Sequence, residues 1–246
     1  MLTELVAVFA FIPWSVPNNN LTHITLPINI ANAPHEYTYA FAQGFVLKGQ
    51  PDADIYTALL PQPDAGPGIS VIRAVFEVYL DAAGSTTVDD NCTPHDRGVT
   101  CAVNFDGTYD NTYNLEVRNT EGTTWNGMAI DTVTRRRIHI GSFTLPVGTG
   151  TTLTSGRGML VFEGQGGGPP WPHCDEFPHS SVVFGVPATD AGVGSLRDPE
   201  EETCKGEDNF KFQRTPDGGI ETSIGFPKAA NICFQHEEGY SIGNCI

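Results

Sequence analysis

Basic residues are scarce in this sequence. Thirteen Lys and Arg stand against 29 Asp and Glu, which gives a net charge of −16 over 246 residues. Binding to a phosphate backbone needs clustered positive charge, so this balance argues against nucleic acid as a partner. It also disfavours strongly anionic polysaccharides unless one patch is locally basic. Neutral glycans, calcium and cationic surfaces remain compatible with the charge.

Long apolar runs and familiar catalytic signatures are missing as well. Leu5–Ile12 is apolar but too short to span a membrane, so we expect no membrane span. No basic residue precedes it and no A-x-A site follows, so it does not read as a signal peptide, and we expect a first strand at Val6–Ile12. The chain also has no G-x-S-x-G elbow and no H-E-x-x-H motif.

Helical periodicity is nearly absent, whereas short alternating or β-branched segments bounded by Gly, Pro, Asn and Asp recur. This spacing predicts a single all-β domain, an antiparallel β-sandwich of jelly-roll type. The predicted strands are Ile24–Ile30, Tyr37–Leu47, Ile69–Leu80, Thr100–Phe105, Tyr113–Asn119, Thr124–Thr132, Arg135–Leu145, Gly158–Glu163 and Ser181–Val186.

The segment after residue 189 differs in composition. Asp198–Asp208 is rich in acidic residues, and two short strands are expected at Asn209–Gln213 and Ile220–Phe226. We therefore expect residues 1–189 to form the sandwich and residues 190–246 to be a disulfide-clamped tail packed on the same domain.

The six cysteines form no C-x-x-C pair, so neither a zinc site nor a thioredoxin-like redox site is indicated. Sequence alone cannot choose among their possible pairings, but local pairs are favoured. An even cysteine count in a polar, Gly- and Pro-rich chain is typical of a secreted protein. The pairs that we expect are Cys92 with Cys101, Cys174 with Cys204, and Cys233 with Cys245.

Several segments of the chain resemble, in order and spacing, a family of secreted fungal and actinobacterial proteins known only as a domain of unknown function. The resemblance covers roughly residues 37–189. It implies secretion and a β-sandwich, and it implies no reaction. The segments that carry it are Ile55–Pro61, Ala74–Phe76, Cys101–Phe105, Tyr113–Val117, Thr123–Gly127, His139–Pro146 and Val182–Gly185.

One hairpin, Thr124–Leu145, carries the strongest candidate site. If its apolar pairs face the core across a three-residue loop, Thr132–Thr134, then a set of polar and aromatic side chains shares the opposite face. The aromatic ring would stack on a sugar, and the arginines would bind hydroxyls or a carboxylate. The alternative is an ordinary solvated face. The residues in question are Trp125, Gly127, Asp131, Arg135, Arg137 and His139.

Three functions follow from this face. The first is a carbohydrate-binding module for a polysaccharide or glycoconjugate. The second is a glycan-active enzyme: a lyase with Arg135 or Arg137 neutralising a uronate and His139 or Tyr56 as base, or a glycoside hydrolase with two carboxylates. The third is a secreted effector or structural protein that recognises another protein. Candidate carboxylates for the hydrolase are Asp131, Glu163, Asp175 and Glu176.

Two loops add weaker candidates. The Gly- and Pro-rich segment Gly164–His179 carries Trp171, which would suit the rim of a sugar site. Asp89, Asp90 and Asp96 lie in one loop closed by cysteines, and clustered oxygen ligands suit a structural Ca²⁺ ion. A solvated acidic loop is the alternative for this second cluster.

Overall fold

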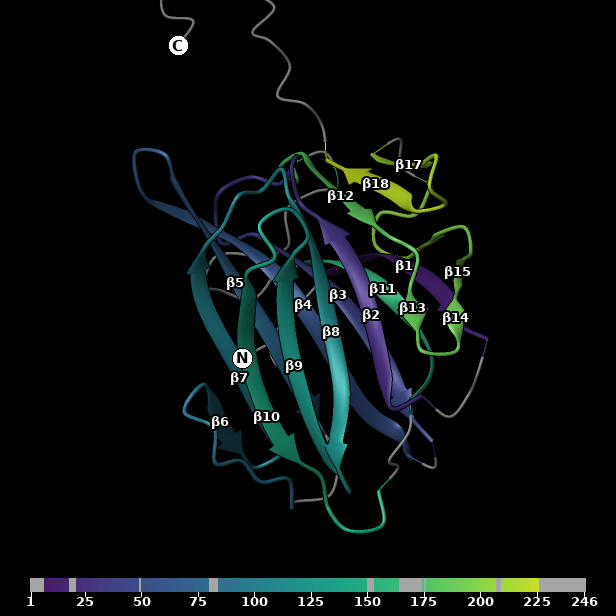
Figure 1. Ribbon diagram of the computed structural model, residues 1–246. Coiled ribbons are helices and arrows are strands. Elements are labelled where there is room, and N and C mark those ends of the chain that lie inside the picture. The colour runs from purple at the N-terminus through teal and green to yellow at the C-terminus, as the bar shows by residue number, and fades with distance from the viewer. Residues whose placement is uncertain are drawn as a thin grey trace, which may run out of the picture.

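The computed structural model describes residues 7–17, 21–48, 50–79, 84–149, 153–163, 174, 176–206 and 209–225. Within these ranges the chain forms two antiparallel sheets packed face to face (Figure 1), and it contains no helix. The predicted all-β sandwich is therefore confirmed. Among these residues there is accordingly no helix long and apolar enough to cross a membrane.

The first sheet, sheet A, has the strand order β15-β1-β11-β3-β4-β5-β7-β6, with β16 also paired to β1. Its strands are β1 (Ala7–Ser15), β3 (Tyr39–Leu47), β4 (Gln50–Gly66), β5 (Ile69–Tyr79), β6 (Cys92–His95), β7 (Gly98–Asp106), β11 (Leu153–Phe162), β15 (Ser195–Leu196) and β16 (Glu200–Glu201).

The second sheet, sheet B, has the order β10-β9-β8-β2-β12-β18-β17, with β13 paired to β2 and to β14. Its strands are β2 (His23–Asn29), β8 (Thr112–Glu121), β9 (Thr124–Asp131), β10 (Arg137–Thr144), β12 (Ser180–Phe184), β13 (Ala188–Thr189), β14 (Gly192–Val193), β17 (Phe210–Arg214) and β18 (Ile220–Ile224).

The predicted strands recur in the structure with boundaries shifted by a few residues, but the longest strand, β4, was not predicted. Its sequence contains Pro51, Pro61 and Pro63, which normally argue against a central strand. Nevertheless β4 lies between β3 and β5, and Pro61 pairs with Ile72. Residues Ile55–Leu60 are buried on both faces of the sheet, in the core between the sheets and in a second apolar cluster on the outer face, and this burial outweighs the missing proline N–H groups.

The tail is part of the sandwich itself. Strand β18 pairs with β12 and β17, so the tail extends sheet B, while β15 and β16 pair with β1 of sheet A. Two of the predicted disulfides, Cys92–Cys101 and Cys174–Cys204, are present. Cys233 and Cys245 lie outside the described residues. The disulfides support the expectation of an extracellular protein.

Large side chains from both sheets fill the space between them. Trp14, Phe76, Trp125 and Phe143 are each at most 2% exposed, and the Phe76 and Phe143 rings stack at a centroid distance of 4.4 Å. Each sheet thus has one face toward this core and one face outward. The outward faces carry the polar groups from which a site can be built.

Candidate functional site

The predicted register of the β9–β10 hairpin is wrong by one residue. Arg137 lies opposite Ile130, and His139 lies opposite Met128. The Asp131 carboxylate accepts hydrogen bonds from the backbone N–H groups of Val133 (2.8 Å) and Thr134 (3.0 Å), which forms a longer turn than expected. Because side chains alternate along a strand, this shift turns the predicted side chains of β9 toward the core, while those of β10 keep the predicted outward face.

The shift also removes the predicted sugar platform. Trp125 is only 1% exposed and points into the core, and Asp131 is 6% exposed on the same side. The space expected at Gly127 is filled by Phe76, whose ring would lie 2.7 Å from an added Cβ. Arg137 and His139 face outward, as predicted. The prediction of one shared face for these side chains is therefore wrong.

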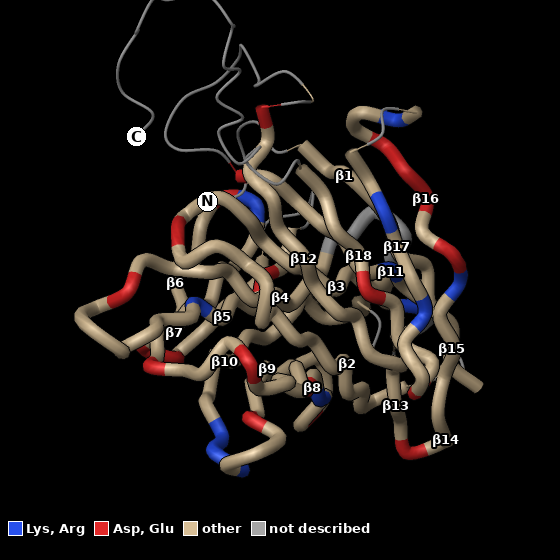
Figure 2. Tube along the Cα trace, turned by 90° about the horizontal axis from the view of Figure 1, so that it is seen from above, with Lys and Arg blue, Asp and Glu red and all other residues tan. Residues whose placement is uncertain are grey.

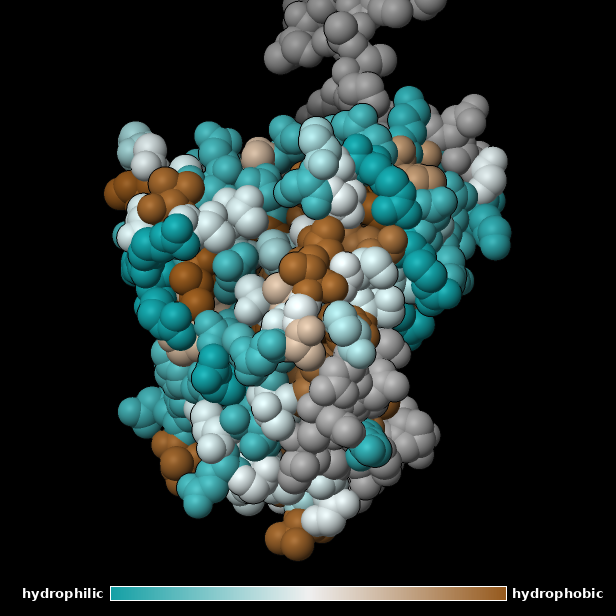
Figure 3. Space-filling model, turned by 45° about the vertical axis from the view of Figure 1, so that its right-hand side comes forward, coloured by the Kyte–Doolittle hydropathy of each residue, from teal (hydrophilic) through white to brown (hydrophobic). Residues whose placement is uncertain are grey.

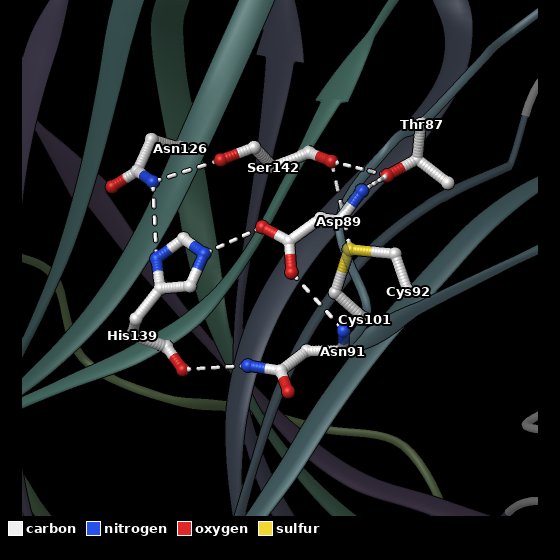
Figure 4. A network of polar contacts seen from close by, with 8 residues as sticks. All are labelled: Thr87, Asp89, Asn91, Cys92, Cys101, Asn126, His139 and Ser142. Atoms are coloured by element: carbon white, nitrogen blue, oxygen red, sulfur yellow. Dashed lines mark hydrogen bonds and ion pairs between the residues drawn. A yellow bond between two sulfur atoms is a disulfide. The ribbon is translucent and has the colours of Figure 1, made fainter.

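The outward-facing His139 is held in a polar network at the edge of sheet B (Figure 4). Its Nε2 lies 2.5 Å from Asp89 Oδ2, and its Nδ1 lies 3.3 Å from Asn126 Nδ2. Asn126 also donates to Ser142 Oγ at 2.9 Å. Since both ring nitrogens have protein partners, neither is open to take a proton from a substrate. This geometry argues against the predicted role of His139 as a base.

The same network explains the lowered pKa of Asp89. Burial alone would raise the pKa of Asp89, but hydrogen bonds from His139 and from the Asn91 backbone hold it below its usual value. Asn91 Nδ2 also donates to the His139 carbonyl at 3.1 Å, so the loop before β6 is clamped to β10. The network is structural.

The predicted calcium ligands Asp89, Asp90 and Asp96 gain no support. Asp89 is engaged by His139, and among the described residues no group of three or more His, Cys, Asp and Glu side chains is arranged to hold a metal ion. Trp171 lies outside the described residues. Arg135 is exposed in the turn with φ +63°, and Arg137 pairs with Glu116 at 3.4 Å.

The outer face of sheet A brings together a different set of residues. Tyr56 on β4 lies directly opposite Glu77 on β5, and Glu77 lies opposite Thr100 on β7. Cross-strand neighbours on one face are close enough for their side chains to touch. Register therefore assembles these three side chains from strands that are distant in the sequence.

Glu77 is the centre of this row. It is 1% exposed, although it lies on an outward face of the sheet. Tyr56 Oη donates to one carboxylate oxygen and Thr100 Oγ1 donates to the other, while His95 Nε2 lies 3.9 Å away. A buried carboxylate with two hydroxyl donors is held by the surrounding protein rather than by water.

Tyr56 was predicted as a possible base, and its surroundings contradict that role. Burial is the main cause that raises the pKa of Tyr56, and the neighbouring Glu77 carboxylate raises it further. A phenol with a raised pKa keeps its proton. Tyr56 therefore acts as a hydrogen-bond donor to Glu77.

A cavity of about 220 Å³ opens beside this row. Glu163, at the end of β11, and Glu77 both line it, so it contains two carboxyl groups. Burial is the main cause that raises the pKa of Glu163; the nearby Glu77 carboxylate adds to the effect and Arg73 opposes it. The polar lining consists of Tyr37, Gln62, Arg73, Glu77, Thr100 and Glu163.

Sequence reasoning missed Glu77 and named Glu163 without a partner. The signal for Glu77 was present, because a single carboxylate stands in the apolar run Ala74–Val78. Only the pairing of β4, β5 and β7 shows which side chains meet it. That pairing depends on β4, which the sequence did not predict because its prolines argue against a central strand.

The rest of the surface gives a weaker signal. Acidic positions are spread around much of the molecule and basic positions form small groups (Figure 2). On the face shown in Figure 3, apolar surface is divided into several small areas among hydrophilic residues. The exposed large apolar side chains, such as Val88, Val147 and Phe212, come from separate segments. The cavity on sheet A is therefore the best candidate site.

No family model and no curated protein matches the chain. The resemblance to the secreted family of unknown function thus stays a prediction. Among solved structures, the chain is similar to scytalido-glutamic peptidase with a peptide-based transition-state analog. The identity is 13% and the TM-score 0.49, over 89% of this chain and 100% of that one.

Two further solved structures are similar. One is SCP-B, a member of the eqolisin family of peptidases, in a complex with the tripeptide Ala-Ile-His, with 11% identity, a TM-score of 0.48, and coverage of 89% and 100%. The other is the enzymatically active domain of tailspike protein 2 from bacteriophage CBA120, with 14% identity, a TM-score of 0.31, and coverage of 78% of this chain and 24% of that one. At these identities and TM-scores the likeness does not bear on the chemistry of this chain.

Proposed function

We propose that this protein is an extracellular glycan hydrolase that works through the carboxyl groups of Glu163 and Glu77. The observation that carries the proposal is the placement of two carboxyl groups with different surroundings in one cavity. Hydrolysis of a glycosidic bond commonly uses such a pair, with one group protonated and the other ionised. Titratable groups perturbed by burial in a cavity are also typical of functional sites.

The surroundings assign a role to each group. The raised pKa of Glu163 keeps its proton to higher pH, as a general acid requires, so Glu163 donates that proton to the glycosidic oxygen. Glu77 accepts hydrogen bonds from Tyr56 and Thr100, which hold its carboxylate in place beside the cavity, and we assign it the second role. Its negative charge stabilises the positive charge that develops on the sugar ring. Water then attacks the anomeric carbon and releases a proton that restores Glu163.

The lining favours a sugar as substrate. Tyr37, which is 56% exposed, offers aromatic surface, and Arg73 offers donors suited to ring hydroxyls. A cavity of about 220 Å³ is below the size typical of small-molecule sites, so it holds one ring of a longer chain. A hydrolase is favoured over a simple binding module because binding alone does not require a buried and a half-buried carboxyl group in one cavity.

The proposal is tested by incubating the purified protein with a panel of extracellular polysaccharides and assaying new reducing ends. We expect Glu163→Gln to reduce turnover on any substrate by about 10²- to 10⁴-fold, the usual contribution of a general acid. Glu121→Gln is the control, because Glu121 is exposed at the end of β8 and the change removes the same charge.

Equal turnover by Glu163→Gln and wild type would contradict the assignment of Glu163 as the general acid. A peptide panel run in parallel distinguishes an error in the proposed substrate class from an error in the proposed catalytic residues. Cleavage of peptides without cleavage of glycans would show that the substrate class is wrong, and silence on both panels would overturn the hydrolase.

A further inference from the structure

A second cavity, of about 400 Å³, lies at the end of the sandwich beside the β9–β10 turn. Three segments form its walls: the β4–β5 turn, the end of β7, and the β9–β10 turn with the start of β10. Its volume falls in the range typical of small-molecule sites. The polar residues among its lining are Ser70, Asp106, Thr108, Asp131, Thr134 and Arg136.

Hydrogen bonds hold the walls of this cavity in place. The Asp131 carboxylate accepts from the backbone of Val133 and Thr134, and its other oxygen accepts from Asn111 Nδ2 at 2.9 Å. Burial opposes ionisation, but these hydrogen bonds outweigh it and lower the pKa of Asp131. On the opposite wall, the Thr108 backbone N–H donates to Tyr113 Oη at 3.0 Å. Binding in a site with fixed walls costs little reordering.

The groups that remain open suit hydroxyl groups. Arg136 Nη1 donates to the Asp106 carbonyl at 2.9 Å, and the other guanidinium N–H groups have no protein acceptor among the described residues. The Asp106 carboxylate and the Ser70 hydroxyl likewise have no side-chain partner in that part of the chain. A guanidinium fork next to a carboxylate presents donors and acceptors side by side, which matches neighbouring hydroxyls of a sugar.

The charge of the lining decides between ligand classes. Two carboxylates, Asp106 and Asp131, stand against one guanidinium, Arg136, on a protein of net charge −16. This balance repels anions. The apolar side chains among the lining, Ile69, Phe105 and Ile138, suit the C–H face of a ring.

We infer that this cavity is a second, non-catalytic binding site for a neutral sugar unit. The site stands independently of the proposed hydrolase, since none of its lining residues is shared with the first cavity. Both cavities border β5, at Ser70 and at Arg73, which are separated by about 10 Å along the strand.

The test is calorimetric titration of Glu163→Gln with four neutral hexasaccharides: cellohexaose, laminarihexaose, mannohexaose and chitohexaose. Glu163→Gln is used so that turnover does not consume the probe. We expect at least one probe to bind, and Arg136→Ala in the same background to weaken binding about 10- to 100-fold through loss of a charged hydrogen-bond donor. Arg118→Ala is the matched control, because Arg118 is exposed on β8 and pairs with Glu116 at 3.3 Å, away from the cavity.

A second variant, Thr134→Trp, blocks the cavity from an exposed turn position without changing charge. Loss of binding in both variants supports the site, whereas unchanged binding in both, or no binding of any probe, overturns it. Tighter binding of hexagalacturonate than of every neutral probe would overturn the ligand class. If the probes bind as expected while the wild type hydrolyses no glycan, the binding site is supported and the proposed hydrolase activity is contradicted.

Discussion

The outer faces of the two sheets carry similar kinds of side chain in very different surroundings. On sheet A, Glu77 is 1% exposed and is held by two hydroxyl donors beside a cavity. On sheet B, Glu116 lies 3.4 Å from Arg137, whose side chain is 56% exposed. Ion pairs open to water contribute little, whereas a buried carboxylate depends strongly on each partner.

This difference shows that residue type is a poor guide to a site in a two-faced sheet. The sequence drew attention to the arginines and histidine of sheet B because they form a conspicuous group. Burial and cross-strand register instead perturb the carboxyl and phenol groups of sheet A. Four substitutions test this contrast.

Trp125→Ala should have the largest effect on stability. Trp125 is 1% exposed in the core, so its truncation is expected to cost about 3–5 kcal/mol in the free energy of unfolding. Denaturant unfolding measures this cost. A loss of less than about 1 kcal/mol would instead place Trp125 at the surface of sheet B, as the sequence first indicated.

Tyr56→Phe should have the second-largest effect on stability. The change removes a hydrogen bond to the buried Glu77 carboxylate, which is expected to cost about 1.5–3 kcal/mol. Tyr37→Phe, at a 56% exposed tyrosine, is the control for loss of a hydroxyl. If the two variants unfold at the same denaturant concentration, then Glu77 does not depend on Tyr56 and the contrast between the two faces fails.

Glu163→Gln should have a smaller, pH-dependent effect on stability. Burial raises the pKa of Glu163 in the folded state. The stabilisation from its protonated form is therefore fully present below the unfolded pKa of about 4.3 and is lost as the pH rises through the folded pKa. Glutamine cannot ionise, so the variant should gain in Tm relative to wild type as the pH rises from about 4 to 7. A Tm difference that does not change with pH would contradict the raised pKa.

Arg137→Ala should have the smallest effect. The Arg137 side chain is 56% exposed, although its partner Glu116 is only 13% exposed, so we expect a loss of about 0.2–1 kcal/mol that shrinks further in high salt. Unfolding curves at low and high salt measure it. A loss as large as that of Tyr56→Phe would mean that sheet B also depends on buried charge.

The sequence by itself determined the all-β class and most strand positions, and it favoured the two disulfides that the structure shows. Alternating apolar residues and the turn residues between them act locally, so they can be read along the chain. The pairs Cys92–Cys101 and Cys174–Cys204 join cysteines that are close in the sequence, which favours them over distant partners. The same local logic predicted the tail strands at β17 and β18.

Only the tertiary structure decided the rest. The Asp131 turn is one residue longer than expected, and that residue turned Trp125 toward the core and so separated it from His139, which faces outward as predicted. Glu77 became a candidate because strand order places Tyr56 and Thr100 on either side of it. Register and burial depend on contacts between distant segments, so neither could be read from the pattern of any one strand.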